Sequence, residues 1–255
     1  MSKIILASKS PRRKEILSQV GIDFEVMVSD KEEIITKEIP SDVVMELSCQ
    51  KAIEVEKQVN YDEYIIIAAD TVVALDNKIL GKPVDRKDAY NMIALIAGRK
   101  HSVYTGVTLI IKSHEKCEVK SFYEETLVDV YSMTEDKINK YLDMDEWNDK
   151  AGGYGIQESF AAYVKSIIGD YYTVVGLPIS RIIYEIENII EIIWEQSGQV
   201  RFVLLLIIYL PSNPGFLPAA VILYPYIASL YKSVFLLSFA MYTKSLAVCF
   251  PFSLL

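Results

Sequence analysis

Three short segments of this chain carry residues whose types and spacing suit the binding of an anion. The first, residues 7–14, reads Ala-Ser-Lys-Ser-Pro-Arg-Arg-Lys and joins an expected strand to an expected helix. The free N–H groups and positive dipole end of a helix favour an anion, whereas Arg12, Arg13 and Lys14 repel the bare helix end. A bound polyanion such as a triphosphate would reverse that cost. The alternative is a solvated basic first turn.

The second segment centres on Asp70, which follows the apolar run at 64–69. Ligands of open α/β sheets bind beyond the carboxyl ends of strands, and a carboxylate placed there is costly to desolvate unless a cation lies beside it. Asp70 could equally cap the next turn. Lys82 could place a charge beside phosphate, and the acidic pair at 32–33 could supply a second metal-binding carboxylate. The alternatives are a turn residue and a solvated loop.

The third segment, residues 150–157, reads Lys-Ala-Gly-Gly-Tyr-Gly-Ile-Gln. Its glycines allow a close approach of the backbone to a ligand, although it lacks both the dinucleotide fingerprint and the P-loop lysine. Gln157 could read a base edge through its paired donor and acceptor, or could be a plain surface amide. The chain has no G-x-S-x-G elbow and only two histidines, which argues against serine-hydrolase and zinc chemistry.

Alternating strands and helices must position these segments. Ser10, Ser41, Asp85, Thr134 and Pro178 are expected helix starts, and Asp70 is expected to end the central strand. The expected strands are 4–7, 24–28, 64–69, 71–75, 78–80, 102–112 and 118–130, with a hairpin turn at 76–77. This order predicts a mixed α/β domain.

Charge divides the 255-residue chain into two parts. The net charge is −8, which argues against a protein that coats nucleic acid, and every acidic residue lies at or before Glu195. Residues 196–255 hold only three charges. We therefore expect a domain at 1–194 and a hydrophobic extension at 195–255. The short apolar start, residues 4–6, is no signal peptide, so a cytoplasmic location is expected.

The extension has three possible interpretations. Residues 202–231 carry no charge and are long enough to span a bilayer, but prolines interrupt them repeatedly. The segment could contact a membrane, add core or dimer surface, or derive from a shifted or fused reading frame. The abrupt change in composition after a complete domain favours the last interpretation.

Six motifs in register carry a resemblance to a known family. They are residues 6–13, 69–73, 81–83, 101–107, 150–157 and 169–178. Together they closely resemble the Maf family of nucleoside triphosphate pyrophosphatases, over about residues 1–193. The resemblance implies a mixed twisted sheet flanked by helices, as in inosine triphosphatases. It also implies hydrolysis of a nucleoside triphosphate to the monophosphate and pyrophosphate, a divalent cation (Mg or Mn) and a homodimer.

The resemblance also assigns roles to nine residues. Asp70 matches the family's proposed proton acceptor. Arg12, Thr71 and Gln157 match the positions that set base specificity, and their types resemble the branch acting on dTTP and UTP. The remaining matches, expected to complete the phosphate and metal site, are Ser8, Arg13, Glu33, Lys51 and Lys82.

The basic helix start would then hold the triphosphate, and Lys82 would stabilise the leaving group. Asp70, with Glu33, would hold the metal, or Asp70 would deprotonate the attacking water. The sequence leaves these two roles of Asp70 open. An alternative function is a non-enzymatic regulator of cell division that binds a nucleotide or a division protein.

Overall fold

The computed structural model describes residues 2–113 and 116–197, all within one compact unit. The expected extension at 195–255 lies outside the described residues except for its first three, which continue the last helix. No helix in the described part of the chain combines the length and apolar character needed to cross a membrane.

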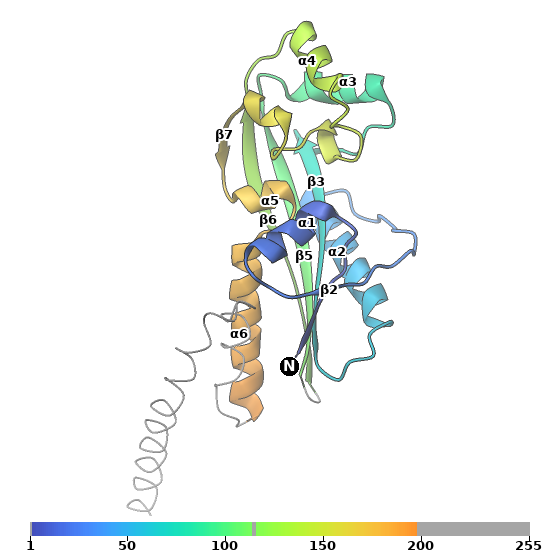
Figure 1. The fold of residues 1–255 in the computed structure, drawn as a ribbon, viewed down its shortest axis with the longest axis vertical. Helices are drawn as coiled ribbons and strands as arrows, with labels where there is room; N and C mark the ends of the chain where they lie inside the picture. The colour runs from blue at the N-terminus through green and yellow to red at the C-terminus, as the bar shows by residue number, and fades with distance from the viewer. Residues whose placement is uncertain (1, 114–115, 198–255) are drawn as a thin grey trace, which may run out of the picture. The chain divides into compact units, whose positions relative to one another are not determined.

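One seven-stranded mixed sheet forms the centre of the fold (Figure 1). Its order is β2-β1-β3-β5-β6-β7, with the short β4 paired to β3. The first three strands in this order are parallel, and the remaining pairs are antiparallel. The strands are β1 (Lys3–Leu6), β2 (Glu25–Val26), β3 (Tyr64–Leu75), β4 (Lys78–Leu80), β5 (Lys100–Ser113), β6 (Lys116–Val130) and β7 (Val164–Ile168).

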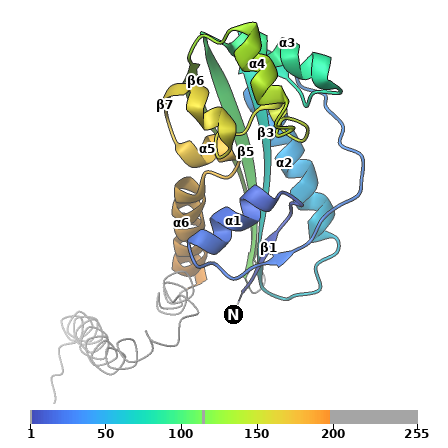
Figure 2. The same cartoon turned by 45° about the horizontal axis from the view of Figure 1, so that its top comes forward.

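Helices flank the sheet, as the sequence predicts (Figures 1 and 2). They are α1 (Pro11–Gln19), α2 (Pro40–Glu56), α3 (Arg86–Ile96), α4 (Glu135–Leu142), α5 (Tyr171–Val175) and α6 (Ile179–Ser197), with 3₁₀ turns η1 (Ala151–Gly153) and η2 (Ser159–Tyr163). The long helix α2 packs on β3 and β5, while α5 and α6 also pack on β5.

Alternation along β3 decides which layer each side chain meets. Ile66 and Ala68 pack with Ala52 of α2, so the even-numbered residues of β3 face that helix. Val73 packs with Ile93 of α3, so the odd-numbered residues face the opposite layer. Adjacent residues of β3 therefore serve two different layers.

The expected end of the central strand at Asp70 is wrong. β3 runs through Asp70 because β5 pairs with it from Tyr64 to Ala74. On its other edge, β1 pairs only as far as Ile67, and β4 begins at Val73. Residues 68–72 thus have no strand partner on that edge, and this gap, rather than a strand end, exposes Asp70.

Several local signals are confirmed. The hairpin turn has positive φ at Asp76 and Asn77, 50° and 63°, and the side chains of Asp85 and Thr134 cap α3 and α4. Ser10 stands at the start of α1, but its side chain makes no capping hydrogen bond. The expected strand at 24–28 shortens to β2, and α2 begins at Pro40 instead of Ser41. β7, η1, η2 and α5 were not predicted from the sequence.

Candidate active site

A cleft of about 1000 Å³ opens at the gap in the sheet edge. Its walls come from the loop after β1, the start of α1, the acidic loop before α2 (residues 30–34), α2 itself, β3 and the glycine-rich loop (residues 150–157). All nine residues predicted for the site line it: Ser8, Arg12, Arg13, Glu33, Lys51, Asp70, Thr71, Lys82 and Gln157. The sequence motifs, far apart along the chain, therefore meet in one place.

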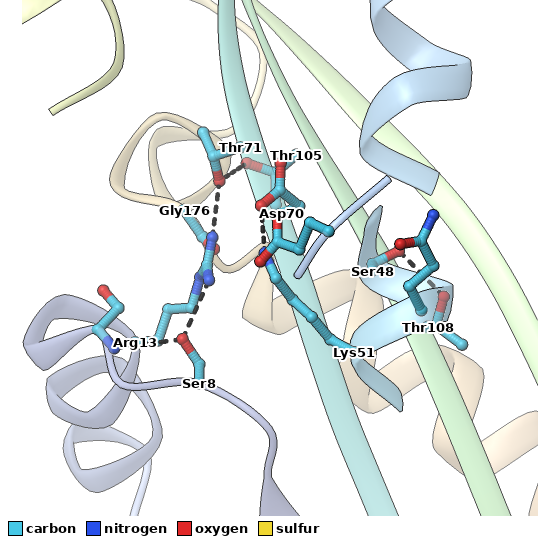
Figure 3. Close-up of polar contacts among 12 residues, drawn as sticks. Ser8, Arg13, Ser48, Lys51, Asp70, Thr71, Thr105, Thr108 and Gly176 are labelled. Atoms are coloured by element: carbon cyan, nitrogen blue, oxygen red, sulfur yellow. Dashed lines mark hydrogen bonds and ion pairs between the residues drawn. The ribbon is translucent and has the colours of Figure 1, made fainter. Parts of the chain in front are cut away.

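Neutral oxygen atoms surround the guanidinium of Arg13 (Figure 3). Nε donates to the carbonyl of Gly176 at 2.8 Å, Nη1 to Ser8 Oγ at 3.0 Å, and Nη2 to Thr71 Oγ1 at 3.1 Å. Burial lowers the pKa of Arg13, while the nearby charge of Asp70 opposes that shift. Arg13 is therefore held in one orientation from the first turn of α1.

Two carboxylates converge on Lys51, which is a residue of α2. Its ammonium makes an ion pair with Asp70 and lies 3.3 Å from a Glu33 oxygen. Asp70 faces α2 because it is an even-numbered residue of β3, and its neighbour Thr71 faces Arg13 on the other layer. These two adjacent residues thus place a carboxylate on one face of the sheet and a hydroxyl on the other, next to the gap in its edge (Figure 3).

The same two carboxylates fit a magnesium or manganese ion. They approach one cationic atom, and Mg²⁺ is commonly held by one or two carboxylates together with substrate phosphates and water. Among the described residues, no group of three or more His, Cys, Asp or Glu side chains could hold a metal by itself. Asp70 and Glu33 would therefore hold a metal that a bound phosphate helps to complete.

Arg12 reaches across the cleft to the glycine-rich side. Its Nη1 lies 3.4 Å from one carboxylate oxygen of Asp149. The other oxygen of that carboxylate accepts a hydrogen bond from Lys150 Nζ at 2.9 Å. Asp149 could not be identified from the sequence, because a lone aspartate before a loop carries no pattern. Lys150 is buried, and its ammonium also lies 3.0 Å from Glu158.

Lys82 and Gln157 stand apart from these contacts. Both line the cleft and are exposed. Within the described residues, Lys82 has no partner in an ion pair. Neither side chain contacts Asp70, so the structure places them on the cleft wall where a ligand could reach them.

A buried histidine makes a hydrogen bond to the glycine-rich loop. His101 Nε2 hydrogen bonds to the Tyr154 hydroxyl at 2.6 Å, and the two rings meet edge to face. Burial lowers the pKa of His101 to about 4, so the ring is neutral near pH 7. The sequence alone did not indicate this support.

This fold and cleft define a class of protein. A mixed α/β sheet opens at one edge into a cleft where basic side chains face two converging carboxylates, an arrangement that suits a phosphorylated ligand and a divalent cation. The model of the family described as "Maf-like protein" matches residues 3–189. The chain belongs to this family, which confirms the resemblance inferred from the motifs.

Curated relatives cover the same part of the chain. A protein named dTTP/UTP pyrophosphatase from Agathobacter rectalis is 49% identical over 205 residues, 74% of this chain and 98% of the relative. One of the same name from Lachnoclostridium phytofermentans is 50% identical over 189 residues, 74% of this chain and 95% of the relative. A solved HAM1 protein from Coxiella burnetii matches with a TM-score of 0.35 and 16% identity, over 51% of this chain and 73% of that one.

Proposed function

We propose that this protein is a nucleoside triphosphate pyrophosphatase that acts on dTTP and UTP. It hydrolyses the α–β phosphoanhydride bond and releases the nucleoside monophosphate and pyrophosphate. The observation that carries the proposal is the convergence of Asp70 and Glu33 on the ammonium of Lys51, beside the fixed guanidinium of Arg13. Relatives that match nearly their full length and bear the name dTTP/UTP pyrophosphatase support the choice of substrate.

The basic side chains bind and orient the triphosphate. Arg13 uses three of its five N–H groups on protein oxygens, which leaves two for phosphate. Lys82, exposed on the cleft wall, stabilises the negative charge that develops on the leaving pyrophosphate. The guanidinium of Arg13, which three hydrogen bonds hold in place, needs little reorganisation as the charge develops.

Asp70 and Glu33 act at the reacting phosphate. A divalent cation held between them would neutralise charge on the α-phosphate and the leaving group. Asp70 either holds this cation or accepts the proton of the attacking water, and its contact with Lys51 orients the carboxylate. Lys51 thus positions the carboxylates while phosphate is absent.

Base selection falls to the side chains around the glycine-rich loop. Gln157 offers a donor and an acceptor to a pyrimidine edge, and Arg12 lies on the facing wall of the same cleft. Thr71, the third expected specificity residue, contacts Arg13. The homodimer stays a prediction from the family resemblance, and the cytoplasmic location stays a prediction from the sequence.

The decisive experiment measures pyrophosphate release by the full chain. The substrates are dTTP, UTP, CTP, GTP and 7-methyl-GTP, each with magnesium or manganese. Asp70→Asn is the test variant, and Asp62→Asn, an exposed aspartate outside the cleft, is the matched control. Activity on dTTP and UTP that disappears only in Asp70→Asn supports the proposal. A folded but inactive wild type would favour the non-enzymatic regulator.

A further inference from the structure

The motif at residues 169–178 contributes none of the nine site residues, yet it forms one wall behind Arg13. Asp170 caps α5 by accepting hydrogen bonds from the backbone N–H of Thr173 at 2.9 Å and from its hydroxyl at 3.1 Å. The helix ends at Val175, and the carbonyl of the next residue, Gly176, accepts a hydrogen bond from Arg13 Nε. This segment therefore presents backbone carbonyls, at Thr173 and Gly176, toward the cleft layer of the sheet.

Gly176 shows how closely this wall approaches the site. Its φ of +116° lies in the left-handed region, which side chains rarely adopt. A Cβ at this position would lie 3.2 Å from Thr71 Oγ1 and 3.7 Å from Arg13 Nε. The glycine thus lets the backbone itself reach the guanidinium.

The hydrogen bonds behind Arg13 run in one direction. Thr105 lies opposite Thr71 in the β3–β5 pairing and is fully buried. Its hydroxyl donates to the carbonyl of Thr173 at 2.7 Å, which uses its single proton because a carbonyl can only accept. In the 2.9 Å contact between the two threonine hydroxyls, Thr71 must then donate to Thr105.

That assignment fixes what Thr71 can offer. Its proton is directed to Thr105, so its oxygen presents only lone pairs on the other side, where Arg13 Nη2 donates at 3.1 Å. The chain of hydrogen bonds is therefore Arg13 to Thr71 to Thr105 to the Thr173 carbonyl. Each member has one possible role as long as Thr105 keeps its hydroxyl; Figure 3 shows the contacts among Arg13, Thr71 and Thr105.

We propose that Thr105 is a positioning residue for phosphate binding, which acts on the substrate only through Thr71 and Arg13. If Thr105 lacks its hydroxyl, the Thr71 hydroxyl has no acceptor and can rotate. The oxygen that accepts from Arg13 Nη2 then no longer has a fixed direction. The inference rests on the proposed pyrophosphatase function, and it gives the motif at 169–178 a role as the wall that holds this arginine.

The test is a double-mutant cycle in the full chain. Thr105→Val removes the hydroxyl at nearly constant volume, Thr105→Ser retains it, and Arg13→Gln removes the guanidinium. Each variant is assayed for kcat/KM on dTTP and UTP and for the Kd of the non-hydrolysable α,β-methylene analogue of dUTP. We expect Thr105→Val to lose about 10–100-fold in kcat/KM, as with other supporting residues, and Thr105→Ser to stay within about threefold of wild type.

The cycle separates positioning from a general structural role. If Thr105 acts through Arg13, adding Thr105→Val to Arg13→Gln changes kcat/KM and Kd by less than about twofold, because the residue on which it acts is already gone. A loss that multiplies equally in both backgrounds would overturn the inference. The Kd arm keeps the comparison measurable where turnover of Arg13→Gln is too slow.

Thr108 supplies a matched control on the same strand. It is also buried, and its hydroxyl contacts those of Ser48 and Ser121 at 3.0 and 2.9 Å, away from Arg13. Thr108→Val should therefore lower the melting temperature like Thr105→Val while keeping kcat/KM within about threefold. An equal loss of kcat/KM in both valine variants would contradict the proposal.

Two further outcomes are distinguishable. If Thr105→Val fails to fold, the comparison of Thr105→Ala with Thr105→Ser decides the same question, since both are smaller than threonine and only one keeps the hydroxyl. If the wild type releases no pyrophosphate from any nucleotide, the proposed function fails. If it is active and Thr105→Val is equally active, only the role of Thr105 fails.

Discussion

Gly106→Ala tests whether the packing of α2 on the sheet sets the position of Lys51. Gly106 lies opposite Asp70 in the β3–β5 pairing, and the backbone of α2 crosses directly over it. A Cβ at this position would come within 2.4 Å of the carbonyl carbon and oxygen of Val44 and 2.7 Å of Met45 N. These are backbone atoms in a long helix, so a change of side-chain rotamer cannot relieve the overlap.

The size of the displacement follows from the contact distance. Ordinary van der Waals contact begins near 3.4 Å, so α2 must move by about 1 Å at Val44. Lys51 is two turns further along the same helix, and a shift of the helix carries its ammonium away from Asp70 and Glu33. Overpacking of this kind costs about 1–3 kcal/mol, and misplacing a site residue by 1 Å can cost about 100-fold in rate.

We therefore expect two effects of Gly106→Ala. The melting temperature should fall by about 2–12 °C, at roughly 2–4 °C per kcal/mol, and kcat/KM for dTTP should fall about 10–100-fold. Thermal unfolding and pyrophosphate release measure them. Gly81→Ala is the matched control, because a Cβ there meets nothing within 4 Å. If Gly106→Ala lost stability but kept kcat/KM within about twofold of wild type, the link from α2 packing to the site would be refuted.

Three further predictions concern single side chains. Lys51→Met should lower the melting temperature in the absence of metal, because Asp70 and Glu33 lose the ammonium that they share. Added MgCl₂ should raise the melting temperature of this variant by more than it raises that of the wild type. An equal rise in both proteins would argue against a metal between the two carboxylates. Gln157→Ala should raise KM for dTTP and UTP about 10-fold without changing the melting temperature, since the side chain is exposed; a change in stability instead would contradict a role in base binding. Burial lowers the pKa of His101 from 6.5 to about 4, so between these pH values the unfolded chain binds a proton that the folded chain does not. The free energy of unfolding therefore falls as the pH drops from about 6.5 to 4, by up to about 3 kcal/mol. Denaturant unfolding of wild type and His101→Gln between pH 7 and 4.5 should show a shallower fall in the variant, and parallel curves would contradict it.

Most of the fold could be predicted from local patterns. The hairpin at Asp76-Asn77 and the caps at Asp85 and Thr134 depend on side chains within a few residues, and the structure confirms them. The continuation of β3 through Asp70 could not be predicted in this way. It depends on pairing with β5, more than thirty residues away, and a polar residue in an apolar run looks like a strand end until that partner is known.

The site shows the same division. The family resemblance identified nine of the residues that line the cleft, and seven of them fall within the six motifs; Glu33 and Lys51 lie outside these motifs. The partners that hold these residues were not predictable: Asp149 at Arg12 and Thr105 behind Thr71 lie 137 and 34 residues from their contacts. The sequence shows which groups carry charge, whereas the hydrogen bonds that fix their orientation arise only from the packed sheet.

The partners of the cations in the cleft differ in a way that bears on anion binding. Arg12 lies beside Asp149, and Lys51 lies between Asp70 and Glu33, so the positive charge of both is largely neutralised before any ligand arrives. Among the described residues, Arg13 has no ion-pair partner within 4 Å, and its hydrogen bonds go to a carbonyl and two hydroxyls. A carboxylate in their place would fix the guanidinium equally well but would cancel its field. Neutral acceptors orient Arg13 without adding a negative charge in direct contact with it, so more of its charge stays available to a polyanion than a bonded carboxylate would leave.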